Sequence, residues 1–191
     1  MTPPVLVLAS GSPRRRQLLE MLGIPIEVRP PHVPEVRNPG ESPQAYVERL
    51  AREKAASVAG PLVLGADTTV VVDGEVLEKP VDATDALRML RRLQGRVHQV
   101  ITAIALKTPD SMLSATDVTA VTFRPADDDV LRAYVATGEP MDKAGAYGIQ
   151  GYGAALVERI DGDFFGVMGL PVRLVLDLLA RAGHPYRFGR D

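Results

Sequence analysis

The chain is predicted to adopt an α/β fold with mixed α+β character, in which a twisted mixed sheet is flanked by helices. Two observations predict it: apolar strand segments and amphipathic helical segments interleave along the chain, and their alternation is not strict enough for a purely parallel sheet. Composition agrees, because 191 residues that are 46% hydrophobic and 24% charged suffice for one globular domain. We therefore expect a single domain over residues 1–191, with room for two lobes.

The N-terminal part is predicted to hold two strands and two helices. Ser12 is a good N-cap and Pro13 suits the first helical position, while Gly23 ends the same helix. The pair Ser42-Pro43 repeats this start signal after a proline-rich loop that contains Glu35. The predicted elements are a strand over 4–9, a helix over 13–22, a strand over 24–29 and a helix from 43 to about 59.

The middle of the chain is predicted to be mainly β. Asp73-Gly74 is a hairpin signal, Pro109-Asp110 marks a second turn, and the apolar spacing of Ala86, Leu87, Leu90 and Leu93 predicts an amphipathic helix. The predicted elements are a strand over 62–72, a return strand through 76–77, a helix over 83–94, a long hairpin of 97–107 and 112–123, and a helix over about 127–137.

The C-terminal part begins with a glycine-rich stretch over 143–153, a composition that suits tight turns and close approach of the backbone to a ligand. Asp161-Gly162 predicts a second hairpin, formed by 154–160 and 163–168. Pro171 is expected to open the last helix, which runs to about residue 182.

Several classes of function are disfavoured. A net charge of −2 argues against a protein that coats nucleic acid, and the absence of cysteine excludes thiolate chemistry and cysteine-ligated metals. No apolar run approaches the length of a membrane span, so we expect a cytoplasmic protein without a membrane partner. The three histidines lack the spacing of a metal-binding helix, and His98 is interpreted as a structural hydrogen-bonding residue.

Charged residues at two places are the first candidates for a functional site. The helix start at Ser12 carries Arg14 and Arg15, which predicts either an anion site or a solvated basic first turn. Asp67 interrupts an apolar strand, where it either caps a local turn or needs a partner such as a lysine or a metal ion.

Lys54, Lys79 and Glu35 are ambiguous by themselves. Taken alone, both lysines and the loop glutamate are interpreted as solvated charges. A loop carboxylate beside Asp67 would nevertheless complete an oxygen-ligand site for Mg²⁺ or Mn²⁺.

Six ordered motifs resemble the signatures of the Maf family over nearly the whole chain. They are Leu8-Ala-Ser-Gly-Ser-Pro-Arg-Arg15, Gly65-Ala-Asp-Thr68, Lys79-Pro80, Gly95-Arg-Val-His98, Asp142-Lys-Ala-Gly-Ala-Tyr-Gly-Ile-Gln-Gly151 and Val167-Met-Gly-Leu-Pro171. The resemblance implies a house-cleaning nucleoside triphosphate pyrophosphatase that uses a divalent metal. It also implies a central cleft like that of inosine triphosphate pyrophosphatases.

The resemblance also implies roles for individual residues. Asp67 matches the catalytic proton acceptor, and Glu35 matches the acidic residue that helps to hold the metal. The positions that match residues around the triphosphate are Ser10, Arg14, Lys54 and Lys79. At Gly166 the chain departs from the family, which commonly has asparagine there.

Three positions resemble the branch of the family that cleaves dTTP and UTP, namely Arg15, Thr68 and Gln150. Members that prefer 7-methyl-GTP typically carry tryptophan in place of Arg15 and glutamate in place of Gln150. A glutamine amide offers donors and an acceptor to a uracil or thymine edge, whereas a carboxylate cannot donate. Two alternatives stay open: an enzyme for modified pyrimidine nucleotides, and a nucleotide-binding regulator of septum formation. A homodimer is the expected assembly.

Overall fold

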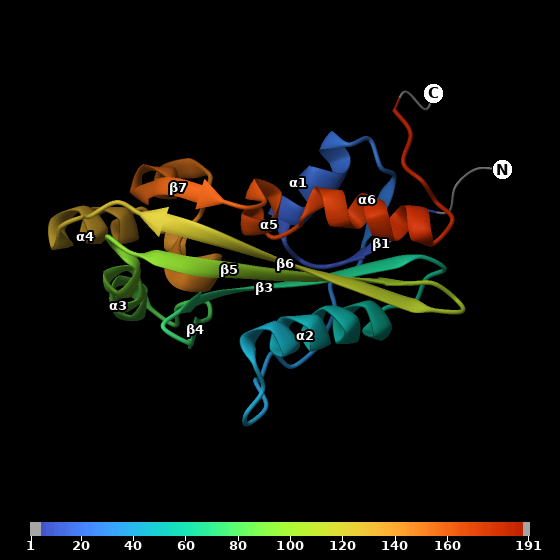
Figure 1. Cartoon of the computed structure of the whole chain (residues 1–191), viewed down its shortest axis with the longest axis horizontal. Coiled ribbons are helices and arrows are strands. Elements are labelled where there is room, and N and C mark those ends of the chain that lie inside the picture. Colours follow the sequence, from blue (N-terminus) through green and yellow to red (C-terminus); the bar gives the residue numbers. More distant parts are fainter. Residues whose placement is uncertain (1–4, 189–191) are drawn as a thin grey trace. The chain divides into compact units, whose positions relative to one another are not determined.

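Strands and helices interleave along the whole of the computed structural model, which describes residues 5–188 (Figure 1). In chain order the elements are β1 (Leu6–Ala9), α1 (Pro13–Met21), β2 (Ile26–Val28), α2 (Pro43–Ser57), β3 (Val63–Val72), β4 (Glu75–Leu77), α3 (Ala83–Leu93), β5 (Val97–Lys107), β6 (Met112–Phe123), α4 (Asp128–Ala136), the 3₁₀ helices η1 (Glu139–Asp142), η2 (Ala144–Ala146) and η3 (Gly151–Leu156), β7 (Val157–Asp161), α5 (Phe164–Met168) and α6 (Val172–Arg181).

The strands of residues 5–188 form a mixed sheet of seven strands, and a mixed sheet is what the sequence predicts. Their hydrogen-bonded order is β2-β1-β3-β5-β6-β7, and β4 pairs with β3 off this path. β1 runs parallel to β2 and to β3, with Leu8 opposite Val28 on one side and Leu64 on the other. β4 and β7 are antiparallel to their neighbours, which confirms the mixed α/β fold class.

Contacts divide the chain into two compact units. Unit 1 holds the described residues up to Asp67, together with Thr102–Asp117 and those from Gly169 onward. Unit 2 holds Thr68–Ile101 and Val118–Met168. The strands β3, β5 and β6 contribute residues to both units, and Asp67 is the last residue of β3 in unit 1.

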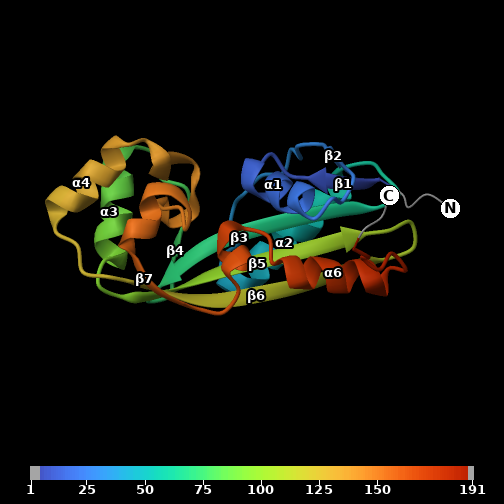
Figure 2. The same cartoon turned by 90° about the horizontal axis from the view of Figure 1, so that it is seen from above.

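In unit 1, helices cover both faces of the strands. α2 lies on one face, and α1 and α6 lie on the other (Figures 1 and 2). The predicted starts of α1 and α2 are confirmed, because Ser12 Oγ accepts from the Arg15 N–H at 3.5 Å and Ser42 Oγ accepts from the Ala45 N–H at 3.2 Å.

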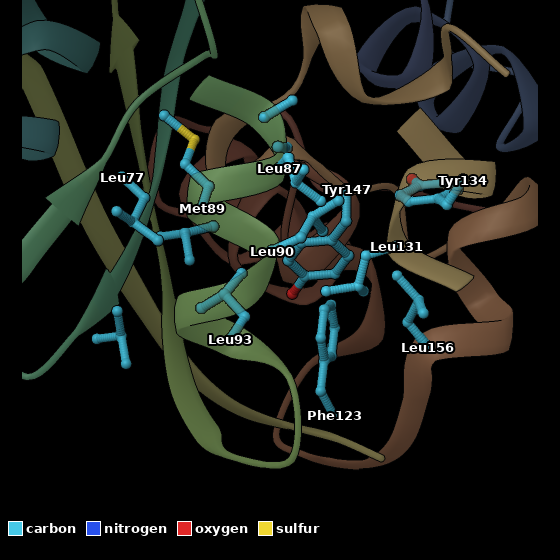
Figure 3. Close-up of a cluster of buried hydrophobic side chains, with 14 of the residues drawn as sticks. Leu77, Leu87, Met89, Leu90, Leu93, Phe123, Leu131, Tyr134, Tyr147 and Leu156 are labelled. Atoms are coloured by element: carbon cyan, nitrogen blue, oxygen red, sulfur yellow. The ribbon is translucent and has the colours of Figure 1, made fainter. Parts of the chain in front are cut away.

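Unit 2 is organised around an apolar cluster between α3, α4 and the 3₁₀ segments (Figure 3). The predicted apolar face of α3 is buried there, including Leu90 and Leu93. Phe123 and Tyr147 meet edge to face, with ring centroids 4.6 Å apart. His98 contacts both rings, at 4.9 Å and 5.4 Å between centroids.

The predicted second hairpin is wrong. β7 covers Val157–Asp161 and pairs with β6, while Phe164–Met168 form the helix α5. The cause is Asp163, whose Oδ1 accepts from the N–H groups of Phe165 at 2.8 Å and Gly166 at 3.1 Å, as an N-cap does. Within residues 5–188, no helix combines the length and apolar character that crossing a bilayer requires.

Candidate active site

The candidate site is built around Asp67, which lies within the apolar strand β3. Ala66, the residue before it, and Thr69, two residues after it, are fully buried, and Asp67 itself is 7% exposed. A carboxylate at this depth needs a partner of opposite charge or hydrogen-bond donors, because water does not solvate it well. The interpretation of Asp67 as a surface cap of a turn is therefore wrong.

That partner is Lys54 on α2, whose Nζ lies 2.7 Å from Asp67 Oδ1. Lys54 is 6% exposed, so its interpretation as a solvated charge is also wrong. Gly65 explains how helix and strand come so close: a Cβ at Gly65 would lie 2.3 Å from the Ala51 carbonyl oxygen. Residues two apart in a strand share a face, so Asp67 points toward α2 as Gly65 does.

Glu35 joins the same ammonium group from the proline-rich loop. Its Oε1 lies 2.5 Å from Lys54 Nζ, and its side chain is 41% exposed. The Lys54 ammonium thus contacts both carboxylates, one buried and one open to solvent. The loop and the strand, 32 positions apart in sequence by their residue numbers, meet at one cation.

Arg15 connects three other segments of unit 1. Its Nη1 donates to Ser10 Oγ at 3.1 Å and to the Ala66 carbonyl oxygen at 3.0 Å. Its Nε donates to the Gly169 carbonyl oxygen at 2.7 Å. The Ser10 hydroxyl, which is buried, also accepts from the Ser12 N–H at 3.2 Å. Arg15 therefore holds the residue before Asp67 in place, and its role with substrate stays a prediction.

Electrostatics at Asp67 are dominated by burial. Burial raises the pKa of Asp67 above its ordinary value, and the Lys54 ammonium and the Arg15 guanidinium oppose this rise only in part. The pKa of Arg15 is lowered, chiefly by burial. A carboxyl group with a raised pKa is a better proton acceptor than an ordinary aspartate when it is ionised.

The remaining predicted residues lie elsewhere on the chain. Arg14 follows Pro13 in the first turn of α1. Thr68 follows Asp67 on β3 and begins unit 2. Lys79 and Gln150 are exposed residues of unit 2, Lys79 beyond β4 and Gln150 just before η3. Their participation in one site with the unit 1 residues stays a prediction.

The site has oxygen donors of the kind that Mg²⁺ and Mn²⁺ prefer. Within residues 5–188, no three side chains of His, Asp or Glu gather as they would for a metal held by protein alone. Magnesium is commonly bound by one or two carboxylates together with substrate phosphates, and Glu35 and Asp67 meet that description. The residues therefore fit a divalent metal that arrives with a phosphate ligand.

Sequence reasoning missed the role of Gly65, although a signal was present. An isolated glycine within a strand pattern indicates close approach of another backbone. It also missed Glu139 and Tyr134, which bind the glycine-rich segment described below, because their partners are backbone groups that no motif reveals. The structural interpretation of His98 is confirmed: its Nε2 lies 2.8 Å from the Tyr147 hydroxyl.

Comparison with known proteins places this arrangement in a family. The family described as Maf-like protein matches residues 5–182 of the chain. This chain belongs to the Maf family. The six motifs identified in the sequence thus lie within a match that covers nearly its whole length.

Curated Maf relatives are similar along almost their entire length. A protein of Anaeromyxobacter sp. (strain Fw109-5), named dTTP/UTP pyrophosphatase, is 52% identical over 185 residues, covering 94% of this chain and 90% of that protein. A Symbiobacterium thermophilum protein with the same name is 52% identical, covering 94% and 95%. An Escherichia coli protein (strain UTI89), also so named, is 53% identical, covering 92% and 91%.

Proposed function

We propose that this Maf protein hydrolyses dTTP and UTP to the nucleoside monophosphate and pyrophosphate. The observation that carries the proposal is the buried Asp67 carboxylate, held 2.7 Å from Lys54 Nζ within a chain about half identical to proteins named dTTP/UTP pyrophosphatase. A nucleotide-binding protein without catalysis has no need of a buried carboxylate poised to accept a proton.

The reaction is an attack of water on the α-phosphorus. Asp67 accepts the proton of the attacking water, and its raised pKa suits that task. Lys54 and the arginines at the start of α1 offset the negative charge of the triphosphate, and Lys79 is assigned the same role. The bond between the α-phosphorus and the bridging oxygen breaks, so pyrophosphate leaves and the monophosphate retains the new oxygen.

Glu35 and Asp67 are the residues that would hold a divalent metal, which we propose is Mg²⁺ or Mn²⁺. Such an ion supplies compensation for the charge that develops on the phosphate oxygens. The single Lys54 ammonium contacts these same two carboxylates and offsets part of their negative charge. We assign this ammonium as a contact for the phosphate groups of the nucleotide as well.

Base selection is assigned to Gln150, with Thr68 and Arg15 as the other residues that match the dTTP- and UTP-cleaving branch. The exposed Gln150 amide can both donate to and accept from a uracil or thymine edge. A base with the wrong pattern would leave those groups unpaired, which penalises its binding. A cytoplasmic location and a homodimer stay predictions.

Product analysis in ¹⁸O-labelled water tests the proposal. The purified protein is incubated with Mg²⁺ and with dTTP, UTP, CTP, GTP or 7-methyl-GTP, and Asp67→Asn serves as the control. We expect pyrophosphate from dTTP and UTP, with the label in the monophosphate. Label in pyrophosphate would mean attack on the β-phosphorus, and release of orthophosphate would mean that the wrong bond was assigned. Tight binding of nucleotide without any product would favour the regulator.

A further inference from the structure

Glu139 binds the backbone of the glycine-rich segment on the C-terminal side of Gln150. Its Oε1 accepts from the Gly153 N–H at 2.9 Å, and its Oε2 accepts from the Tyr152 N–H at 2.9 Å. Both carboxylate oxygens are therefore engaged by consecutive amides of η3. A carboxylate accepts such bonds more strongly than a neutral group does.

Tyr134 of α4 binds the same segment on the N-terminal side of Gln150. Its hydroxyl accepts from the Gly148 N–H at 3.1 Å and donates to Glu139 Oε1 at 2.9 Å. The two side chains form one connected network, and the amides they bind lie two residues before Gln150 and two and three residues after it. Tyr134 is buried, so its hydroxyl does not exchange these partners freely with water.

The glycines of this segment leave room for that network. Gly151 has a φ of +72°, and a Cβ there would lie 2.4 Å from Glu139 Oε2. A Cβ at Gly153 would lie 2.2 Å from the Gly148 carbonyl oxygen and 2.6 Å from the Tyr134 hydroxyl oxygen. On the C-terminal side of the exposed Gln150, the backbone thus lies close to the Glu139 and Tyr134 side chains. It also lies close to the backbone of Gly148, on the N-terminal side.

Glu139 stays ionised near neutral pH. Its partial burial alone would raise its pKa, but the bonds from Gly153, Tyr152 and Tyr134 outweigh that effect, so the pKa lies below its ordinary value. Glu139 also shapes the segment through its main chain, whose carbonyl oxygen accepts from Lys143 Nζ at 2.6 Å. The whole network lies within unit 2.

We propose that Glu139, together with Tyr134, is a positioning residue that fixes the backbone around Gln150 and so sets the preference for uracil and thymine. The inference rests on the proposed function, because Gln150 is assigned to the base there. Neither residue takes part in the hydrolysis. Their effect is on which base is accepted, because a fixed amide can impose its donor and acceptor pattern and a mobile one can rotate to suit other bases.

The first measurement is amide hydrogen exchange of the segment, followed by NMR in the free protein. Glu139→Gln replaces one accepting oxygen with an NH₂ group that must face an amide N–H, and Tyr134→Phe removes only the hydroxyl. In Glu139→Gln we expect exchange at Tyr152 and Gly153 to become at least about tenfold faster, which is the effect of losing a charged hydrogen bond. In Tyr134→Phe we expect faster exchange at Gly148, whose amide loses its partner. Glu158→Gln, at an exposed position of β7, is the matched control and leaves this exchange unchanged.

The second measurement is the ratio of kcat/KM for UTP to kcat/KM for GTP. In Glu139→Gln and Tyr134→Phe we expect this ratio to fall about tenfold through the KM for UTP, with kcat nearly unchanged because Asp67 is untouched. A structural loss that inactivated the enzyme would instead lower turnover of both nucleotides together.

The outcomes separate the two proposals. Unchanged exchange in both variants would overturn the network as a restraint on the segment, whatever the activity. Faster exchange with an unchanged nucleotide ratio would overturn its role in selectivity. A native protein that releases no pyrophosphate from dTTP or UTP would overturn the proposed function and the selectivity role with it, and the exchange rates would still decide the restraint.

Discussion

Lys54 Nζ lies 2.7 Å from Asp67 Oδ1, and both side chains are almost completely withdrawn from solvent. Removing one partner from such a pair leaves an uncompensated buried charge, which destabilises a protein far more than the loss of a surface ion pair. The pair persists because Glu35 provides a second carboxylate at the ammonium and because Gly65 lets α2 approach β3. Burial nevertheless raises the proton affinity of the Asp67 carboxylate, because the Lys54 ammonium opposes that rise only in part.

Asp67→Asn is expected to lower kcat for dTTP and UTP by about 10²- to 10⁴-fold, the usual contribution of a general base. The amide keeps the shape of the side chain and removes its capacity to take a proton. Nucleotide binding, measured by calorimetry without added divalent metal, should change little. The control is Asp110→Asn at the exposed turn between β5 and β6. Lost binding with normal turnover at saturation would contradict the assigned role.

The rate should fall on acidification at a pH above the ordinary range of aspartate. Asp67 must be ionised to accept a proton, and burial raises its pKa, so activity is lost as the pH falls through that raised value. Lys54 opposes the rise, and Lys54→Met should therefore move the acid limb of the kcat/KM profile, which reports the free enzyme, to still higher pH. An acid limb that stays in place in Lys54→Met would count against Asp67 as the titrating group.

Gln150→Glu is expected to lower the ratio of UTP to GTP turnover, because a carboxylate cannot donate to a uracil carbonyl oxygen. Loss of one hydrogen bond between the enzyme and the base that it selects lowers kcat/KM roughly 10-fold or more. The comparison uses kcat/KM for both nucleotides, with release of pyrophosphate as the readout. A ratio equal to that of the native chain would remove Gln150 from base recognition.

Gly65→Ala should destabilise the protein by at least about 1–3 kcal/mol, the cost of overpacking a closely packed core. The added methyl group would lie 2.3 Å from the Ala51 carbonyl oxygen and 2.6 Å from the Ala55 nitrogen, so α2 must move away from β3. Gly11→Ala is the matched control, because its Cβ would meet only Pro30 Cβ at 4.0 Å. Urea unfolding of the two variants should differ clearly.

His98 should make the fold sensitive to acid. Burial lowers its pKa to about 4, from an unfolded value of 6.5, so the unfolded chain binds the extra proton first and stability falls as the pH drops from 6.5 toward 4. Between pH 7 and pH 5 this group contributes a loss of about 2 kcal/mol. The charged form is disfavoured further because, among the described residues, Nδ1 has no hydrogen-bond partner.

Urea unfolding at pH 7 and pH 5 measures this contribution. His98→Gln should show a smaller loss of stability between the two pH values than the native chain does. His32→Gln, at an exposed position, is the control for the replacement of a histidine by glutamine. Equal pH dependence in all three proteins would mean that His98 does not titrate differently in the folded and unfolded chain.

Much of the fold was predictable because its signals are local. The long strands over 97–107 and 112–123 were predicted with the bounds that the structure has, since alternating and β-branched residues end at a strong turn. The N-caps Ser12 and Ser42 were predictable for the same reason, because a cap bonds within its own first turn. The segment after Asp163 was wrongly predicted to be a strand, because the preceding pair Asp161-Gly162 is a hairpin signal. In the structure the Asp163 side chain instead accepts hydrogen bonds from the first turn of α5.

By itself, the sequence determined most of the elements in their order, the mixed α/β class and, through six ordered motifs, the family. The roles of the site residues that the motifs suggest stay predictions. Only the tertiary structure decided that Lys54 is a buried partner of Asp67 and Glu35 and not a solvated charge, that Gly65 sets the spacing of α2 and β3, and that Glu139 and Tyr134 hold the segment around Gln150. The physical reason is the separation in sequence between the groups that interact. Caps, turns and periodicity depend on neighbours in sequence, whereas the environment of a buried charge or a backbone amide depends on groups that folding brings from elsewhere in the chain.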